Sequence, residues 1–134
     1  MTVRFLLDTN AASYVINRKS PAMDRRLARV PMPELAVSAV TEGELRYGAA
    51  RIGSFRLQAT LDQFLAAVTV LPWDSKTAQA YGRLRAALER EGRLLGSLDM
   101  MIAAHALSLG LTLISADRAF SRIKQLRTED WTRP

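Results

Sequence analysis

The sequence predicts an α/β protein, a three-layer α/β/α sandwich with a central, mainly parallel sheet. Short and almost wholly apolar segments alternate along the chain with longer amphipathic segments. This pattern is typical of parallel strands that helices cover on both faces. The chain has 134 residues, 49% of them hydrophobic, which is enough for one core. We therefore expect a single domain over residues 1–134.

The first half of the chain is predicted to form two strands and four helices. In order, these are a strand over 3–7, helices over 10–18 and 21–30, a strand over 35–38, and helices over 40–51 and 54–67. Pro21 takes a position that the first turn of a helix tolerates. Leu57, Leu61 and Phe64 recur at the spacing of one helix face, which supports the last of these helices.

The second half continues the alternation. In order, we predict a strand over 69–71, a helix from residue 75 to about residue 91, a helix over 97–109, a strand over 111–115, a short helix over 118–123 and a last strand near Leu126. Pro72 ends the first of these strands, and Asp74 or Ser75 can cap the helix that follows. Gly110 ends the helix over 97–109.

Composition narrows the functional class. The chain contains no cysteine, so disulfides, thiolate metal sites and cysteine nucleophiles are excluded, and a reducing, cytoplasmic location is expected. No apolar segment reaches the roughly 20 residues that a membrane span needs, so we expect no membrane partner. The net charge of +6 is explained either by a polyanionic partner or by solvated, arginine-rich helix faces.

Acidic and polar side chains follow the predicted strands. Asp8 and Asn10 come after the strand over 3–7, while Ser115 and Asp117 lie at the end of the strand over 111–115. The carboxyl ends of parallel strands meet at one edge of the sheet, where ligands bind in this fold class. These residues are therefore expected near one another.

Two helices bring further acids toward this edge. Glu42 and Glu44 lie on the helix after the second strand, and Asp99 lies in the first turn of the helix over 97–109. Each acid also has a purely structural explanation, as a helix cap, a dipole partner or a solvated charge; Asp99, for example, follows a capping Ser97 by two residues. Spacing alone does not choose between Glu42 and Glu44.

Taken together, the acids indicate a cation site. Carboxylates that share a site raise one another's pKa unless a cation lies among them. Oxygen ligands without cysteine suit Mg²⁺ or Mn²⁺. Acidic clusters that hold such ions support phosphoryl chemistry.

Three stretches of this chain occur in the order LLDTN, SAVTEGELRYGA and GRLLGSLDMMIAAHALSLGLTLISAD. They resemble the diagnostic blocks of PIN-domain ribonucleases, and most closely those of the VapC toxins of bacterial VapBC toxin–antitoxin pairs. The resemblance implies a PIN-like fold and an acidic site that is both catalytic and metal-binding. Its ligands would be Asp8, Glu44, Asp99 and Asp117, with Asn10 and Ser115 as supporting residues. Glu44, rather than Glu42, matches the acid of the family's E-L-x-x-G pattern.

The resemblance also implies a function. The chain would be the toxin of a type II toxin–antitoxin system, a Mg²⁺-dependent endoribonuclease (Mn²⁺ being the alternative) that cleaves structured RNA, tRNA or rRNA, by a metal-activated water. A VapB-type antitoxin would neutralise it, in a homodimer-based heterotetramer or larger complex that meets DNA only through the antitoxin. The alternatives are a housekeeping RNA-processing PIN nuclease and a non-catalytic RNA-binding PIN module.

Other residues receive more modest interpretations. Four arginines near the acids in sequence are the candidate RNA contacts: Arg46, Arg51, Arg118 and Arg122. His105 has no second histidine to share a metal with, so it is interpreted as a packed residue. Trp73, Trp131 and Tyr47 are likewise expected to pack rather than to stack on bases.

Overall fold

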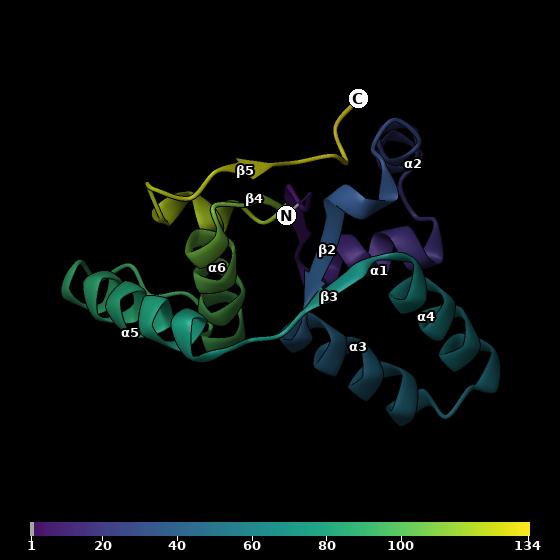
Figure 1. The fold of residues 1–134 in the computed structure, drawn as a ribbon, viewed down its shortest axis with the longest axis horizontal. Coiled ribbons are helices and arrows are strands. Elements are labelled where there is room, and N and C mark those ends of the chain that lie inside the picture. The colour runs from purple at the N-terminus through teal and green to yellow at the C-terminus, as the bar shows by residue number, and fades with distance from the viewer. Residues whose placement is uncertain (1) are drawn as a thin grey trace.

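In the computed structural model, which describes residues 2–134, five parallel strands form one sheet (Figure 1). The strands are β1 (Phe5–Leu7), β2 (Leu35–Ser38), β3 (Thr69–Leu71), β4 (Thr112–Ile114) and β5 (Thr128–Glu129). Their order in the sheet is β3-β2-β1-β4-β5, and every neighbouring pair is parallel. The central strand β1 thus has a partner on each side, and all carboxyl ends point to one edge.

Helices cover both faces of this sheet (Figure 1). They are α1 (Thr9–Asn17), α2 (Pro21–Leu27), α3 (Ala39–Ile52), α4 (Phe55–Ala67), α5 (Ser75–Arg90) and α6 (Ser97–Leu109), together with 3₁₀ turns at Met32–Glu34 and Arg118–Arg122. Helices α5 and α6 lie on one side of the sheet, and α1 to α4 lie on the other. The predicted α/β/α sandwich is therefore confirmed. No helix within residues 2–134 is long and apolar enough to cross a membrane.

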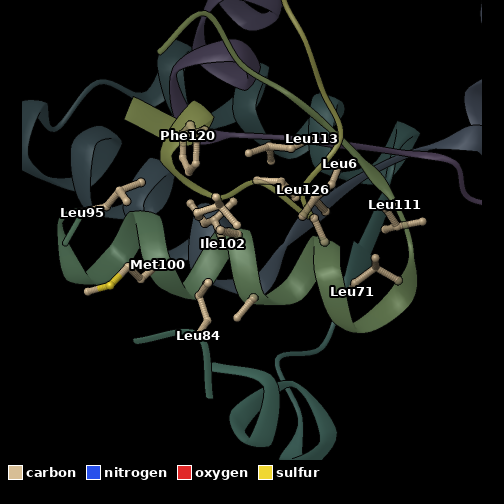
Figure 2. Close-up of a cluster of buried hydrophobic side chains, with 14 of the residues drawn as sticks. Leu6, Leu71, Leu84, Leu95, Met100, Ile102, Leu111, Leu113, Phe120 and Leu126 are labelled. Atoms are coloured by element: carbon tan, nitrogen blue, oxygen red, sulfur yellow. The ribbon is translucent and has the colours of Figure 1, made fainter. Parts of the chain in front are cut away.

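Alternate residues of each strand feed two separate cores. Leu6 of β1 and Leu113 of β4 face α6 and α5, and Figure 2 shows Ile102 of α6 beside them with Leu84 of α5 on the other side of that helix. Leu7 of β1 faces the opposite way, into the cluster formed with α1 to α4. Because both faces of the interior strands are buried, β1, β2 and β4 are mostly apolar, which is what made them recognisable in the sequence.

Side-chain caps set the start of most helices. Asp8, Ser20, Ser38, Ser54 and Asp74 each accept a hydrogen bond from a backbone N–H in the first turn of the following helix. Such caps satisfy donors that have no partner within the helix. Helix α6 differs, since Gly96 is its N-cap residue and no side chain caps it. The prediction that Ser97 caps this helix is therefore wrong, because Ser97 is already the first helical residue.

The last strand was also placed incorrectly from the sequence. Strand β5 comprises Thr128 and Glu129 and pairs with β4, whereas the prediction was a strand near Leu126. Leu126 is 8% exposed and belongs to the core, but it lies in a turn whose backbone N–H donates to the carbonyl of Ile123. The apolar side chain of Leu126 correctly indicated a core residue. Strand β5, which follows Leu126, is polar and lies at the sheet edge, so its sequence gives no hydrophobic signal.

Candidate functional site

Asp8 joins the central strand to the first helix. It is 4% exposed. Its backbone N–H donates to the carbonyl of Ile114 on β4 (3.0 Å), and its Oδ1 accepts from the backbone N–H of Ala11 (2.7 Å). Asp8 is thus the N-cap of α1, as the structural explanation proposed. Capping occupies one carboxylate oxygen in this way, and Oδ2 accepts no bond from a backbone N–H of residues 2–134.

The surroundings of Asp8 disfavour its negative charge. Burial is the main cause that raises the pKa of this carboxyl group above its ordinary value. Hydrogen bonds from the Ser115 side chain and from Ala11 offset part of the rise, and the charges of Asp99 and Asp117 add to it. Ser115, which is buried, therefore lies beside Asp8, and three of the predicted acids are close enough to interact.

Asp99 and Asp117 reach the same edge from two other elements. Asp99 is half-buried in the first turn of α6, and burial raises its pKa, followed by the charges of Asp117 and Glu44. Asp117 is exposed and caps the short 3₁₀ turn, where its Oδ1 accepts from the backbone N–H of Ala119 (2.9 Å). The backbone N–H of Asp117 in turn donates to Ser115 Oγ (3.0 Å). The loop after β4 is therefore held in place by its own polar side chains.

The structure distinguishes Glu44 from Glu42. Glu44 Oε1 accepts from the hydroxyl of Thr9 (2.6 Å), which lies next to Asp8 in the chain, and Thr9 also lies 3.1 Å from the hydroxyl of Thr41. Glu42 instead pairs with Arg46 at 2.8 Å. Of these two glutamates, only Glu44 lies near enough to Asp99 to raise the pKa of that carboxyl group, in addition to burial and Asp117. Thr9 is a site residue that sequence reasoning missed, although its position directly after Asp8 was a usable signal.

The four acids Asp8, Glu44, Asp99 and Asp117 share an absence of cationic partners. None of them takes part in an ion pair with a lysine or arginine of residues 2–134. Across these residues, no group of three or more histidine or acidic side chains is arranged to hold a metal ion as it stands. The oxygen donors of these four acids and the repulsion between their charges suit a hard divalent cation. The side chains are not already arranged around a cation position in residues 2–134.

A mainly apolar groove opens beside the acids. Its volume is about 330 Å³, and it runs between α1, α3 and α4. Thr9, Asn10 and Glu44 line one part of it, while Ile16 and Leu57 line the more apolar part. Asn10 is exposed here, so its amide is available to a bound molecule. The acidic edge and an apolar surface are thus continuous.

Comparison with known proteins agrees with this site. The family model described as PIN domain matches residues 5–126. The chain is 39% identical over 132 residues to the tRNA(fMet)-specific endonuclease VapC of Shigella flexneri, covering 97% of this chain and 99% of that protein. It is 38% identical over 131 residues to ribonuclease VapC2 of Haemophilus influenzae, covering 96% and 98%.

The chain is a PIN-domain protein of the VapC ribonuclease family. Solved structures agree with this assignment. A crystal structure of DNA-bound VapBC from Salmonella typhimurium contains a chain with a TM-score of 0.89 and 35% identity, covering 96% of this chain and 98% of that one. A structure of VapBC-1 from nontypeable Haemophilus influenzae gives a TM-score of 0.84 at 30% identity, covering 97% and 99%.

The arginines predicted as RNA contacts of this VapC-family chain differ in their availability. Arg46 bridges Glu42 and Asp62 (2.8 and 3.2 Å), so its charge is compensated within the chain. Arg122 donates to the carbonyl of Leu94 (2.8 Å), although it is exposed. The two remaining candidates, Arg51 and Arg118, are exposed and make no ion pair among residues 2–134.

Three of the four packing predictions for this PIN domain are confirmed. His105 is 1% exposed and Trp131 is 3% exposed. Trp73 is partly buried, and its indole N–H donates to the carbonyl of Met101 (3.0 Å). Tyr47 was predicted incorrectly: it is 68% exposed, because the face of α3 that carries it points away from the sheet.

Proposed function

We propose that this chain is the toxin of a VapBC-type toxin–antitoxin pair and that its acidic edge binds Mg²⁺ and cleaves RNA. One observation carries the proposal above the others. Asp8, Glu44, Asp99 and Asp117 come together from four different elements and make no ion pair among residues 2–134, and burial and then neighbouring acids raise the pKa of both Asp8 and Asp99. The ribonuclease activity for which the VapC relatives are named supports the nuclease assignment.

Each residue has a distinct part in this proposal. Asp8 would be the best-oriented ligand, because Ala11 and Ser115 hold its carboxylate. Thr9 would orient Glu44 toward the same site. A bound Mg²⁺ would supply Lewis-acid chemistry, polarising the scissile phosphate and promoting ionisation of water. Asp99 and Asp117 complete the set of oxygens, with Mn²⁺ as an alternative ion.

Structured RNA is the proposed substrate. VapC relatives from Shigella flexneri and Salmonella typhimurium are named tRNA(fMet)-specific endonucleases, at 39% and 36% identity, which makes tRNA the first substrate to test and rRNA the second. The formal charge of +6 supports binding of a polyanion. The basic surface would attract phosphate chains to the acidic edge, where a bound cation would offset the charge of the phosphate.

A VapB-type antitoxin is the proposed inhibitor. Similar chains occur in VapBC complexes. The groove between α1, α3 and α4 begins at Thr9 and Glu44 and continues over apolar side chains, and Ile52 and Phe55 near its end are 64% and 89% exposed. An antitoxin segment with apolar residues would fit this groove and block the acids. We further propose a homodimer that assembles with the antitoxin, which alone contacts DNA.

The decisive experiment measures cleavage of tRNA by protein freed of antitoxin. Wild-type protein should cut with Mg²⁺ or Mn²⁺ and stop cutting when EDTA is added. Asp99→Asn should lower the cleavage rate by roughly a hundredfold or more, because it removes a charge from the reacting centre. Glu42→Gln is the matched control, since Glu42 pairs with Arg46 outside the site. Cleavage that persists in EDTA and in Asp99→Asn would refute the metal site.

A smaller effect is expected at Thr9. Thr9→Val keeps the shape of the side chain but removes the hydroxyl that donates to Glu44. A hydrogen bond to a charged group contributes about 1.5 kcal/mol or more, which corresponds to roughly a tenfold loss of kcat/KM. Thr9→Ser retains the hydroxyl and should retain most of the activity. Equal activity of the valine and serine variants would exclude a positioning role for Thr9.

A further inference from the structure

A second hollow, about 280 Å³ in volume, lies between α2 and the carboxyl-terminal segment. Four arginines line it: Arg25, Arg26, Arg29 and Arg133. None of them belongs to the acidic edge or to the four arginines predicted from the sequence. A cavity whose charged walls are mostly guanidinium groups is suited to an anion, because guanidinium donates two parallel hydrogen bonds to phosphate or carboxylate oxygens.

Two of the four arginines are oriented by neighbours. Arg26 Nη2 lies 3.2 Å from Glu129 Oε1, and its guanidinium lies 5.1 Å from the ring centre of Trp131. Arg133 Nε lies 3.3 Å from Asp130 Oδ2. Trp131 is itself packed edge-on against Phe5 of β1, with ring centres 5.0 Å apart. One wall of the hollow is thereby anchored to the core.

Arg25 and Arg29 make up the remaining positive charge. Both are exposed, and neither pairs with a carboxylate of residues 2–134. Arg25 lies on α2, and Arg29 lies in the turn after the last residue of this helix, Leu27, where the N–H of Arg29 donates to the carbonyl of Arg26. Both side chains line the same hollow. After pairing of the other two arginines, these two charges remain for a ligand.

The sheet places this hollow beside the acids. Strand β5 runs parallel to β4, and the backbone N–H of Ser115 donates to the carbonyl of Glu129 (3.0 Å). The residues after β5 therefore leave the sheet at the edge where Asp117 follows β4. A third hollow of about 190 Å³, lined by Asn10, Asp117 and Thr132 among others, lies next to the arginines, because Thr132 is the chain neighbour of Trp131 and Arg133.

We propose that the arginine-lined hollow binds a phosphate of the RNA strand that flanks the phosphate being cleaved. This inference rests on the proposed function, and it adds a subsite to it. A strand with one phosphate at Asp8 and Asp99 would continue past Asn10 and Thr132 and bring a neighbouring phosphate to Arg25 and Arg29. These contacts position the strand without reading its bases.

The test compares RNA binding by two variants of equal charge in the full-length, antitoxin-free protein. The first is Arg25→Gln/Arg29→Gln. The control is Arg83→Gln/Arg90→Gln, which removes two exposed arginines from α5 on the other side of the sheet. Both pairs are placed in an Asp99→Asn background so that the tRNA probe stays intact during titration at several salt concentrations.

We expect the first pair to weaken tRNA binding at least tenfold and the control pair to weaken it much less. The slope of log K against log salt should fall by about 1.4 for the first pair, since each single-strand phosphate contact contributes about 0.7. In the otherwise wild-type protein, the same pair should raise KM by a larger factor than it lowers kcat, because binding of a flanking phosphate is similar in the ground and transition states.

The possible failures are distinguishable. If the wild-type protein neither binds nor cuts tRNA, the proposed function fails. If it does both, and the two double variants behave alike, only the subsite is refuted. The subsite is also refuted if the first pair leaves RNA binding intact but prevents association with a co-expressed antitoxin, since the hollow would then hold an acidic protein segment. Unchanged thermal unfolding of both pairs verifies that folding is unaffected.

Discussion

Asp8→Asn should make the metal-free protein more stable while it lowers RNA cleavage by roughly a hundredfold to a thousandfold. Asp8 is 4% exposed, and burial and neighbouring acids disfavour its charge. Asparagine is an equally good N-cap, so the bond from the N–H of Ala11 is retained while the charge is removed. The unfolding midpoint in EDTA should rise by a few degrees.

The stabilisation should depend on pH in a defined direction. Since the pKa of Asp8 is raised by folding, the folded protein binds the proton more tightly than the unfolded chain does. The free energy of unfolding therefore falls as the pH rises above the ordinary value of 3.8, and the loss is complete once the pH exceeds the raised pKa. The advantage of Asp8→Asn should be complete near neutral pH and should disappear as the pH falls toward the ordinary carboxyl value of 3.8.

Differential scanning calorimetry of both proteins in EDTA, from pH 4 to pH 8, measures this effect. Asp117→Asn is the matched control, because Asp117 also caps a helical turn but is exposed, and it should give little stabilisation. With excess Mg²⁺, wild-type protein should gain stability and Asp8→Asn should gain less. A lower midpoint for Asp8→Asn at neutral pH in EDTA would mean that the buried charge is compensated within the chain.

His105→Leu should be among the most destabilising single substitutions in this chain. His105 is 1% exposed. Its Nδ1 lies 2.8 Å from the hydroxyl of Ser38. Leucine would remove this hydrogen bond from the fully buried Ser38 hydroxyl, at about 1–3 kcal/mol. We expect a loss of roughly 1–3 kcal/mol in the free energy of unfolding.

The hydrogen bond between His105 and Ser38 also connects the elements that carry the acids. Ser38 ends β2 and caps α3, accepting from the backbone N–H of Val40 (3.1 Å). His105 lies on α6, six residues after Asp99. The bond between Ser38 and His105 therefore ties the start of the helix that carries Glu44 to the helix that carries Asp99. Cleavage by His105→Leu should fall even at temperatures at which the variant remains folded.

One conservative variant tests the hydrogen bond of His105. His105→Asn places a polar amide where Nδ1 lies within hydrogen-bond distance of the Ser38 hydroxyl. It should lose about half of the stability that leucine loses, as measured by urea unfolding. Because burial lowers the pKa of His105, the wild-type advantage over leucine should shrink as the pH falls below 6.5. If His105→Leu were as stable as the wild-type protein, the buried hydrogen bond to Ser38 would contribute nothing to the free energy of unfolding.

Most of the fold could be predicted from local residue patterns. Strands β1, β2 and β4 lie in the interior of the sheet and are therefore mostly apolar, and helices α4 and α5 carry apolar residues on one side. The misplaced strand β5 shows the limit of such patterns. It lies at the edge of the sheet and contains only Thr128 and Glu129, so its backbone pairing with β4 is the only thing that defines it.

The sequence by itself determined the α/β class, the order of the elements and the acids after the strands, because periodicity and capping are local properties. Only the tertiary structure decided that Thr9 supports Glu44, that Arg46 neutralises Glu42, and that α2 brings unpaired arginines beside the carboxyl-terminal segment. These relationships depend on how distant segments pack. Residues 9 and 44, or 25 and 133, become neighbours only when the helices dock on the sheet.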